Sequence, residues 1–151
     1  MVAGGETARD RSRERARPGR LSVQRVLLVA LGGAIGTAIR HAVTVGAAAW
    51  LGTGFPYGTL LVNLAGSFAI GFVQQVAADS GLVPDDLRLF VTTGLMGGLT
   101  TYSAFSYETA RMLEASAWTA AVLNVALTTT LCLVLCILGI AAGRALVGPR
   151  V

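Results

Sequence analysis

The sequence is poor in charged side chains and in the side chains that enzymes use for catalysis. Charged residues make up 13% of its 151 residues, and it has one His, two Cys and no Lys. Soluble domains contain about 25% charged residues, so this composition excludes an ordinary water-soluble domain. The shortage of nucleophiles, bases and metal ligands argues against an enzyme, and two cysteines are too few for a zinc site.

Hydrophobic residues are abundant instead and make up 54% of the chain. They concentrate in four stretches, each long enough to cross about 30 Å of hydrocarbon as a helix. The sequence therefore predicts an all-α membrane protein with one transmembrane domain over residues 25–146. The predicted spans are 26–49, 57–78, 87–113 and 115–143.

The two ends of the chain differ from this apolar body. Residues 1–24 form an Arg-rich, low-complexity tail that we expect to be disordered, and residues 147–151 form a short C-terminal tail. Arginine flanks favour the cytoplasmic side, which predicts that both termini are cytoplasmic. We expect the N-terminal tail to contact anionic lipid rather than nucleic acid, because no aromatic residues or folded module accompany it.

Small and polar residues recur at helical spacing within the predicted spans. Gly32 with Gly36, and Gly139 with Gly143, are pairs that allow helix backbones to approach closely. Two polar stripes with a spacing of four residues lie on single helix faces. Such stripes either join helices through hydrogen bonds or line a shared polar path, and the spacing leaves both open. The stripes are Thr59, Asn63 and Ser67, and Asn124, Thr128 and Cys132.

The third predicted span contains a segment that is unfavourable for a helix. Residues 94–106, GLMGGLTTYSAFS, are dense in glycine and hydroxyl side chains, so the helix is predicted to break there. Unwound backbone in a membrane is tolerated where its carbonyls are buried or bind an ion, often a cation. After the break, Tyr102 and Phe105 share one helix face. The pair either packs or turns its electropositive ring edges toward an anion.

These residues resemble the Fluc, or CrcB, family of fluoride channels over about residues 25–145. The resemblance rests on three segments: GGAIGTAIRH (32–41), YGTLLVNLAGSFAIGF (57–72) and TTGLMGGLTTYSAFSYE (92–108). It implies an antiparallel, dual-topology homodimer, with the third helix broken mid-membrane, two fluoride pores along the dimer interface and a sodium ion on the two-fold axis. An oppositely oriented paralogue is the alternative partner, because the Arg-rich tail favours one orientation of this chain.

The resemblance also assigns roles to individual positions. The backbone carbonyls of Gly97 and Thr100 would hold the structural sodium ion, and Arg40 would lie in an aqueous vestibule. Tyr102 stands where the family usually has Phe. The fluoride pore would be lined by Asn63, Tyr102, Phe105, Ser103, Thr128 and Glu108.

The function expected from this resemblance is passive, fluoride-selective export through a multi-pass protein of the cell's inner (plasma) membrane. Its partners would be fluoride, membrane lipid and a second subunit, with no nucleic acid. One alternative is a small multidrug-resistance-type, proton-coupled cation exporter, which needs a membrane-embedded acid. The first span offers only Arg40 and His41, so Glu108 would have to serve. A structural membrane subunit without transport activity is the third possibility.

Overall fold

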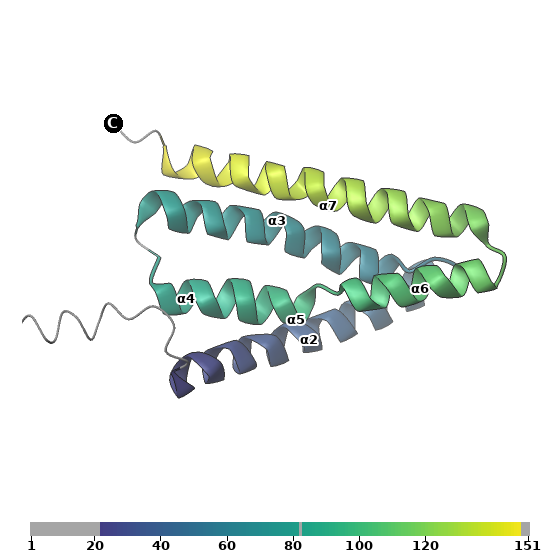
Figure 1. The fold of residues 1–151 in the computed structure, drawn as a ribbon, viewed down its shortest axis with the longest axis horizontal. Coiled ribbons are helices and arrows are strands. Elements are labelled where there is room, and N and C mark those ends of the chain that lie inside the picture. Colours follow the sequence, from purple (N-terminus) through teal and green to yellow (C-terminus); the bar gives the residue numbers. More distant parts are fainter. Residues whose placement is uncertain (1–21, 82, 149–151) are drawn as a thin grey trace, which may run out of the picture.

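The described chain is a bundle of four antiparallel rows of helix (Figure 1). The structure is a computed structural model that describes residues 22–81 and 83–148, and these residues contain no strand. The start of the first helix and the end of the last lie at the same end of the bundle (Figure 1). In chain order the elements are α2 (Val23–Leu51), α3 (Tyr57–Ser80), α4 (Asp85–Leu89), the π-helix η1 (Phe90–Met96), α5 (Gly97–Leu99), α6 (Tyr102–Glu114) and α7 (Trp118–Val147).

Three of these helices, α2, α3 and α7, are long and apolar enough to cross a membrane. The predicted span 115–143 corresponds to α7, which begins three residues later because Ser116 turns the chain with a φ of +57°. The third row runs from Asp85 to Glu114 in shorter pieces. The chain is thus an all-α, multi-pass membrane protein.

Most of the predicted tail, residues 1–24, lies outside the described residues, although α2 already includes residues 23 and 24.

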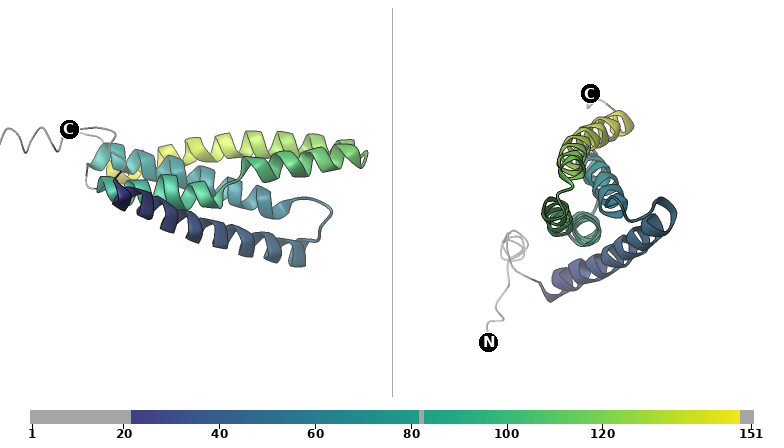
Figure 2. Two further views of the ribbon diagram at one scale, coloured as in Figure 1. Left: turned by 60° about the horizontal axis from the view of Figure 1, so that its bottom comes forward. Right: turned by 90° about the vertical axis from the view of Figure 1, so that its right-hand side faces the viewer.

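The row that contains η1 and α5 packs against α2 at the predicted glycine pair (Figures 1 and 2). A Cβ atom on Gly32 would lie 2.7 Å from the carbonyl oxygen of Phe90, and one on Gly36 would lie 2.8 Å from the amide nitrogen of Leu99. Neither position has room for a side chain. The close approach expected for this pair is therefore confirmed, and it fixes the backbone just before the break.

The second glycine pair joins α7 to α3, which lie side by side over most of their length (Figure 1). A Cβ atom on Gly139 would lie 2.9 Å from the amide nitrogen of Phe72, and one on Gly143 would lie 2.9 Å from the Cβ atom of Gln75. The expected packing role of this pair is confirmed as well.

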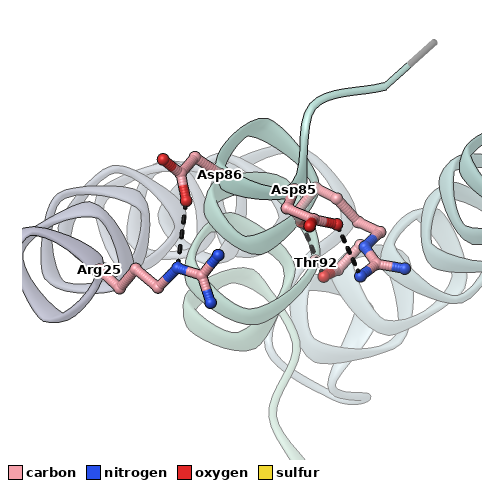
Figure 3. A network of polar contacts seen from close by, with 5 residues as sticks. Arg25, Asp85, Asp86 and Thr92 are labelled. Atoms are coloured by element: carbon pink, nitrogen blue, oxygen red, sulfur yellow. Dashed lines mark hydrogen bonds and ion pairs between the residues drawn. The ribbon is translucent and has the colours of Figure 1, made fainter. Parts of the chain in front are cut away.

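One ion pair joins α2 to α4 near the start of α2, and a second lies within α4 (Figure 3). The Nε atom of Arg25 lies 3.2 Å from Oδ1 of Asp86, and within α4 Arg88 pairs with Asp85 at 3.1 Å. The four side chains are between 46% and 73% exposed, so each pair contributes about 1 kcal/mol or less to stability. They orient the third row at its start, and packing of Val62, Met96 and Leu99 holds it further along.

Candidate functional site: a helix break and two cavities

The third row breaks at Thr100 and Thr101, inside the predicted segment. Thr100 has a ψ of 154° and Thr101 a φ of −153°, so both are extended between α5 and α6. The predicted break is confirmed. The π-helix η1 that precedes it widens the helix locally, a feature that is common near functional sites.

The side chain of Asn63, on α3, bonds to the backbone of this break. Its Oδ1 accepts a hydrogen bond from the Thr101 amide at 2.8 Å, and its Nδ2 donates to the Thr101 carbonyl at 3.2 Å. Both residues are buried, with 6% of Asn63 and 7% of Thr101 exposed. The amide side chain therefore pairs with both the N–H and the C=O of one residue, as a residue of a neighbouring antiparallel strand would.

The hydroxyl of Thr101 begins the next helix. Its Oγ1 accepts a hydrogen bond from the backbone N–H of Ala104 at 3.2 Å, the usual geometry of an N-cap. Thr100 bonds instead to the preceding helix, because its amide and its hydroxyl both donate to the carbonyl of Met96, each at 2.9 Å. The two adjacent threonines thus end one helix and start the next.

A cavity of about 390 Å³, here called the break cavity, lies beside these residues. Its lining combines one amide, several hydroxyls, two aromatic rings and apolar groups, and none of the described residues that line it is charged. It brings together six of the nine residues assigned from the family resemblance: Asn63, Gly97, Thr100, Tyr102, Phe105 and Thr128.

The two rings that line the break cavity are adjacent in space. The ring centroids of Tyr102 and Phe105 lie 5.4 Å apart with an interplanar angle of 50°. Phe105 is 7% exposed, whereas Tyr102 is 80% exposed in the single subunit. Phe105 therefore belongs to the interior of the subunit, whereas the ring of Tyr102 lies at the surface of the subunit.

A second cavity of about 430 Å³, here called the end cavity, lies at the end of the bundle near the connection between α2 and α3. Its lining includes Glu108, whose Oε1 accepts a hydrogen bond from the Thr59 hydroxyl at 2.7 Å. The other carboxylate oxygen, Oε2, is buried and has no partner among the described residues. Arg111 also lines this cavity and pairs with Glu114 at 2.5 Å. Glu108 is thus separated from the break cavity, in which four of the other five predicted pore residues meet.

Asn124, in the polar stripe on α7, joins two helices. Its Nδ2 donates to the hydroxyl of Thr109 on α6 at 2.9 Å, and its Oδ1 accepts from Thr128 at 3.4 Å. Of the two interpretations of this stripe, helix joining therefore holds for Asn124. Thr128 combines both, since it bonds to Asn124 and lines the break cavity.

Two predicted residues lie outside both cavities. Arg40 is half-buried on α2, and Ser103 is exposed, with its Oγ 3.2 Å from Oγ1 of Thr101. Sequence reasoning missed the structural roles of Thr101 and Thr109. The preference for threonine at helix N-caps was an available signal for Thr101, whereas the bond from Asn124 to Thr109 has no local signal.

Comparison with known proteins finds a family model that matches most of the chain and several named relatives. Residues 27–140 match the sequence model of a family described as CrcB-like protein, Camphor Resistance (CrcB). A "Fluoride-specific ion channel FluC" from Sorangium cellulosum is 42% identical over 83% of this chain and 98% of its own length. Relatives with the same name from Shewanella frigidimarina and Geobacter metallireducens are 46% and 42% identical over 76% and 79% of this chain, and over 91% and 96% of their own lengths.

Proposed function

The chain belongs to the CrcB-like protein family, and from this membership we propose that it is a fluoride-selective channel that passively exports fluoride from the cytoplasm. It would act as a channel and not as an enzyme. The observation that carries the proposal is the break cavity, because it gathers hydrogen-bond donors and ring edges beside a helix break without any charged side chain among its described lining residues.

The lining of the break cavity suits a small, dehydrated anion. The amide of Asn63 has a second N–H in addition to the one that donates to Thr101, and the Thr128 hydroxyl could donate to the ion by releasing Asn124 Oδ1. The edges of Phe105 and Tyr102 carry the positive end of the ring quadrupole. The N-terminus of α6 also borders the cavity, and its positive dipole end favours negative charge. Several weak contacts of this kind can replace the water of a halide while still allowing it to leave.

Export along this path needs no energy coupling. Hydrogen fluoride crosses a bilayer as a neutral acid and dissociates in a more alkaline cytoplasm, which traps the anion. A membrane potential that is negative inside then drives the anion outward with about 2.3 kcal/mol per 100 mV. A selective leak is therefore sufficient to lower the internal concentration.

Two copies of the chain would complete each pore by meeting in opposite orientations. Within one subunit, Tyr102 and Gly97 line the break cavity and are nevertheless exposed, so part of its wall is open. A Cβ atom on Gly97 would meet nothing within 4 Å, so packing inside the subunit does not require glycine there. An exposed glycine of this kind suits the close approach of a second subunit, either another copy or a paralogue, with lipid around the pair.

The carbonyls of Gly97 and Thr100 from both subunits would hold a structural sodium ion between the two pores. Sodium is bound in membrane proteins by unwound backbone carbonyls and by the negative C-terminal ends of broken helices, and both features occur at the end of α5. The donor set therefore fits a hard monovalent cation. When bound, the ion would supply positive charge beside each pore.

Fluoride efflux from liposomes that contain the purified protein, followed with an ion-selective electrode under an imposed potential, tests the proposal. We expect rapid, voltage-driven fluoride release without a proton gradient, and no comparable chloride release. Release of a cationic drug that depends on a pH gradient, with vesicles tight to fluoride, would support the exporter, for which Glu108 is the available acid. Vesicles tight to both would identify a structural subunit.

A further inference from the structure

The end of α5 leaves the carbonyls of residues 97–100 without the partners that a continuous helix would give them, and for two of them, Gly97 and Thr100, a side chain accepts from the missing amide. In an α-helix each carbonyl accepts from the amide four residues later. The partner of Gly97 would be the amide of Thr101, and the partner of Thr100 would be the amide of Ala104. Both amides donate elsewhere in this structure, and the acceptor in each case is a side chain.

The first diversion comes from α3. The Thr101 amide donates to Asn63 Oδ1 at 2.8 Å, which takes this amide away from the Gly97 carbonyl, and Asn63 Nδ2 donates in return to the Thr101 carbonyl at 3.2 Å. The partners are 38 residues apart in sequence and both are buried, so this pairing is part of the tertiary packing.

The second diversion is local. The Ala104 amide donates to Thr101 Oγ1 at 3.2 Å, which starts α6 one residue after Thr101 and leaves the Thr100 carbonyl outside the helix. The hydroxyl of Thr100 does not compete for the space at its own carbonyl, because it donates backward to Met96 at 2.9 Å.

We propose that Asn63 and Thr101 are positioning residues that free and orient the Gly97 and Thr100 carbonyls for the sodium ion. The inference rests on the proposed function. It states that two side chains determine which carbonyls are left available to the ion. Asn63 acts on Gly97 through the Thr101 amide, and Thr101 acts on Thr100 through the cap of α6. Neither side chain touches the ion.

This role differs measurably from that of a residue that only contacts fluoride. A fluoride contact changes fluoride flux alone, whereas a positioning residue also changes the response of the folded protein to sodium. The readout is the melting temperature of the purified protein in detergent, measured without fluoride as sodium chloride replaces choline chloride. We expect sodium to raise the melting temperature of the unsubstituted protein.

Thr101→Val keeps the shape of the side chain and removes the hydroxyl, and Thr101→Ser keeps the hydroxyl. We expect Thr101→Val to need roughly 10- to 100-fold more sodium for half of the stabilisation, the usual cost of losing a group that supports metal ligands. Thr101→Ser should respond as the unsubstituted protein does. Thr119→Val, at an exposed position near the start of α7, controls for the loss of a threonine hydroxyl.

Asn63→Asp separates the two roles of Asn63, because the carboxylate still accepts from the Thr101 amide but brings a negative charge to the break cavity. We expect its sodium response to persist while its fluoride flux is lost. An unchanged sodium response in Thr101→Val, or a lost response in Asn63→Asp at an unchanged melting temperature in choline, overturns the inference. Absence of any sodium response in the unsubstituted protein also overturns it, while fluoride flux from the same preparation decides the channel proposal separately.

Discussion

The two cavities beside α3 have similar volumes, about 390 and 430 Å³, but they differ in whether charged side chains line them. The break cavity has an uncharged lining of amide, hydroxyl and ring groups among the described residues, whereas the end cavity is lined in part by Glu108 and Arg111. Charged side chains are costly away from water and are screened where water reaches them. Under the proposed function, we expect charged side chains to meet hydrated ions at the end of the bundle and neutral donors to meet the dehydrated ion at the break.

Adding a charge to the break cavity should remove the difference between the two cavities and have the largest effect on fluoride flux. In Asn63→Asp the new carboxylate repels a fluoride ion by about 4 kcal/mol at 4 Å and intermediate dielectric, which corresponds to a flux about a thousandfold lower. Liposome efflux measures this effect. Substantial flux in the Asp variant would place the ion path outside the break cavity.

Removing the bond to the acid of the end cavity should mainly reduce stability. In Thr59→Val the part-buried Oε1 atom of Glu108 loses its donor, which costs about 1 kcal/mol, the lower end of the range for an acceptor left without a partner. Thermal unfolding in detergent should show this loss, and Thr59→Ser should restore most of it. Equal stability of the Val and Ser variants would mean that the bond contributes nothing.

Removing a ring from the break cavity should have a smaller effect on transport. Phe105→Ile keeps an apolar side chain and removes the electropositive ring edge, whose interactions are worth about 1 kcal/mol. We expect fluoride flux to fall about fivefold, with the melting temperature as the control for packing. An unchanged turnover at unchanged stability would show that Phe105 only packs.

The smallest effect is expected at the rim of the end cavity. Arg111 is exposed and paired with Glu114, and such surface charges contribute about 0.5 kcal/mol. Arg111→Gln should lower fluoride flux about twofold at low ionic strength and leave it unchanged at high ionic strength, because screening removes long-range attraction. A loss that persists at high salt would mean that this guanidinium contacts the ion directly.

Local sequence signals predicted much of the architecture. Apolar length gave the positions of the helices, and the density of glycine and hydroxyl residues located the break within the segment that contains Thr100 and Thr101. A spacing of three residues correctly put Tyr102 and Phe105 side by side. Each of these features depends on neighbours within a few positions of the chain.

The pairing between helices could not be predicted in the same way. Periodicity placed Thr59 and Asn63 on one face of α3, but the register of α3 against the third row decides that Asn63 meets Thr101 and that Thr59 meets Glu108. That register depends on glycine contacts and side-chain volumes along whole helices. The separation of Glu108 from the break cavity follows from the same register.

The open surroundings of Gly97 allow folding and association to be studied separately. A methyl group at this position would clash with nothing in the subunit, and glycine inside a helix is less favourable than alanine by about 1 kcal/mol. We therefore expect Gly97→Ala to leave the stability of the single chain unchanged or to raise it. A loss of dimers in that variant would therefore report on association of the subunits, through their contact or the sodium ion between them, and not on folding of the single chain.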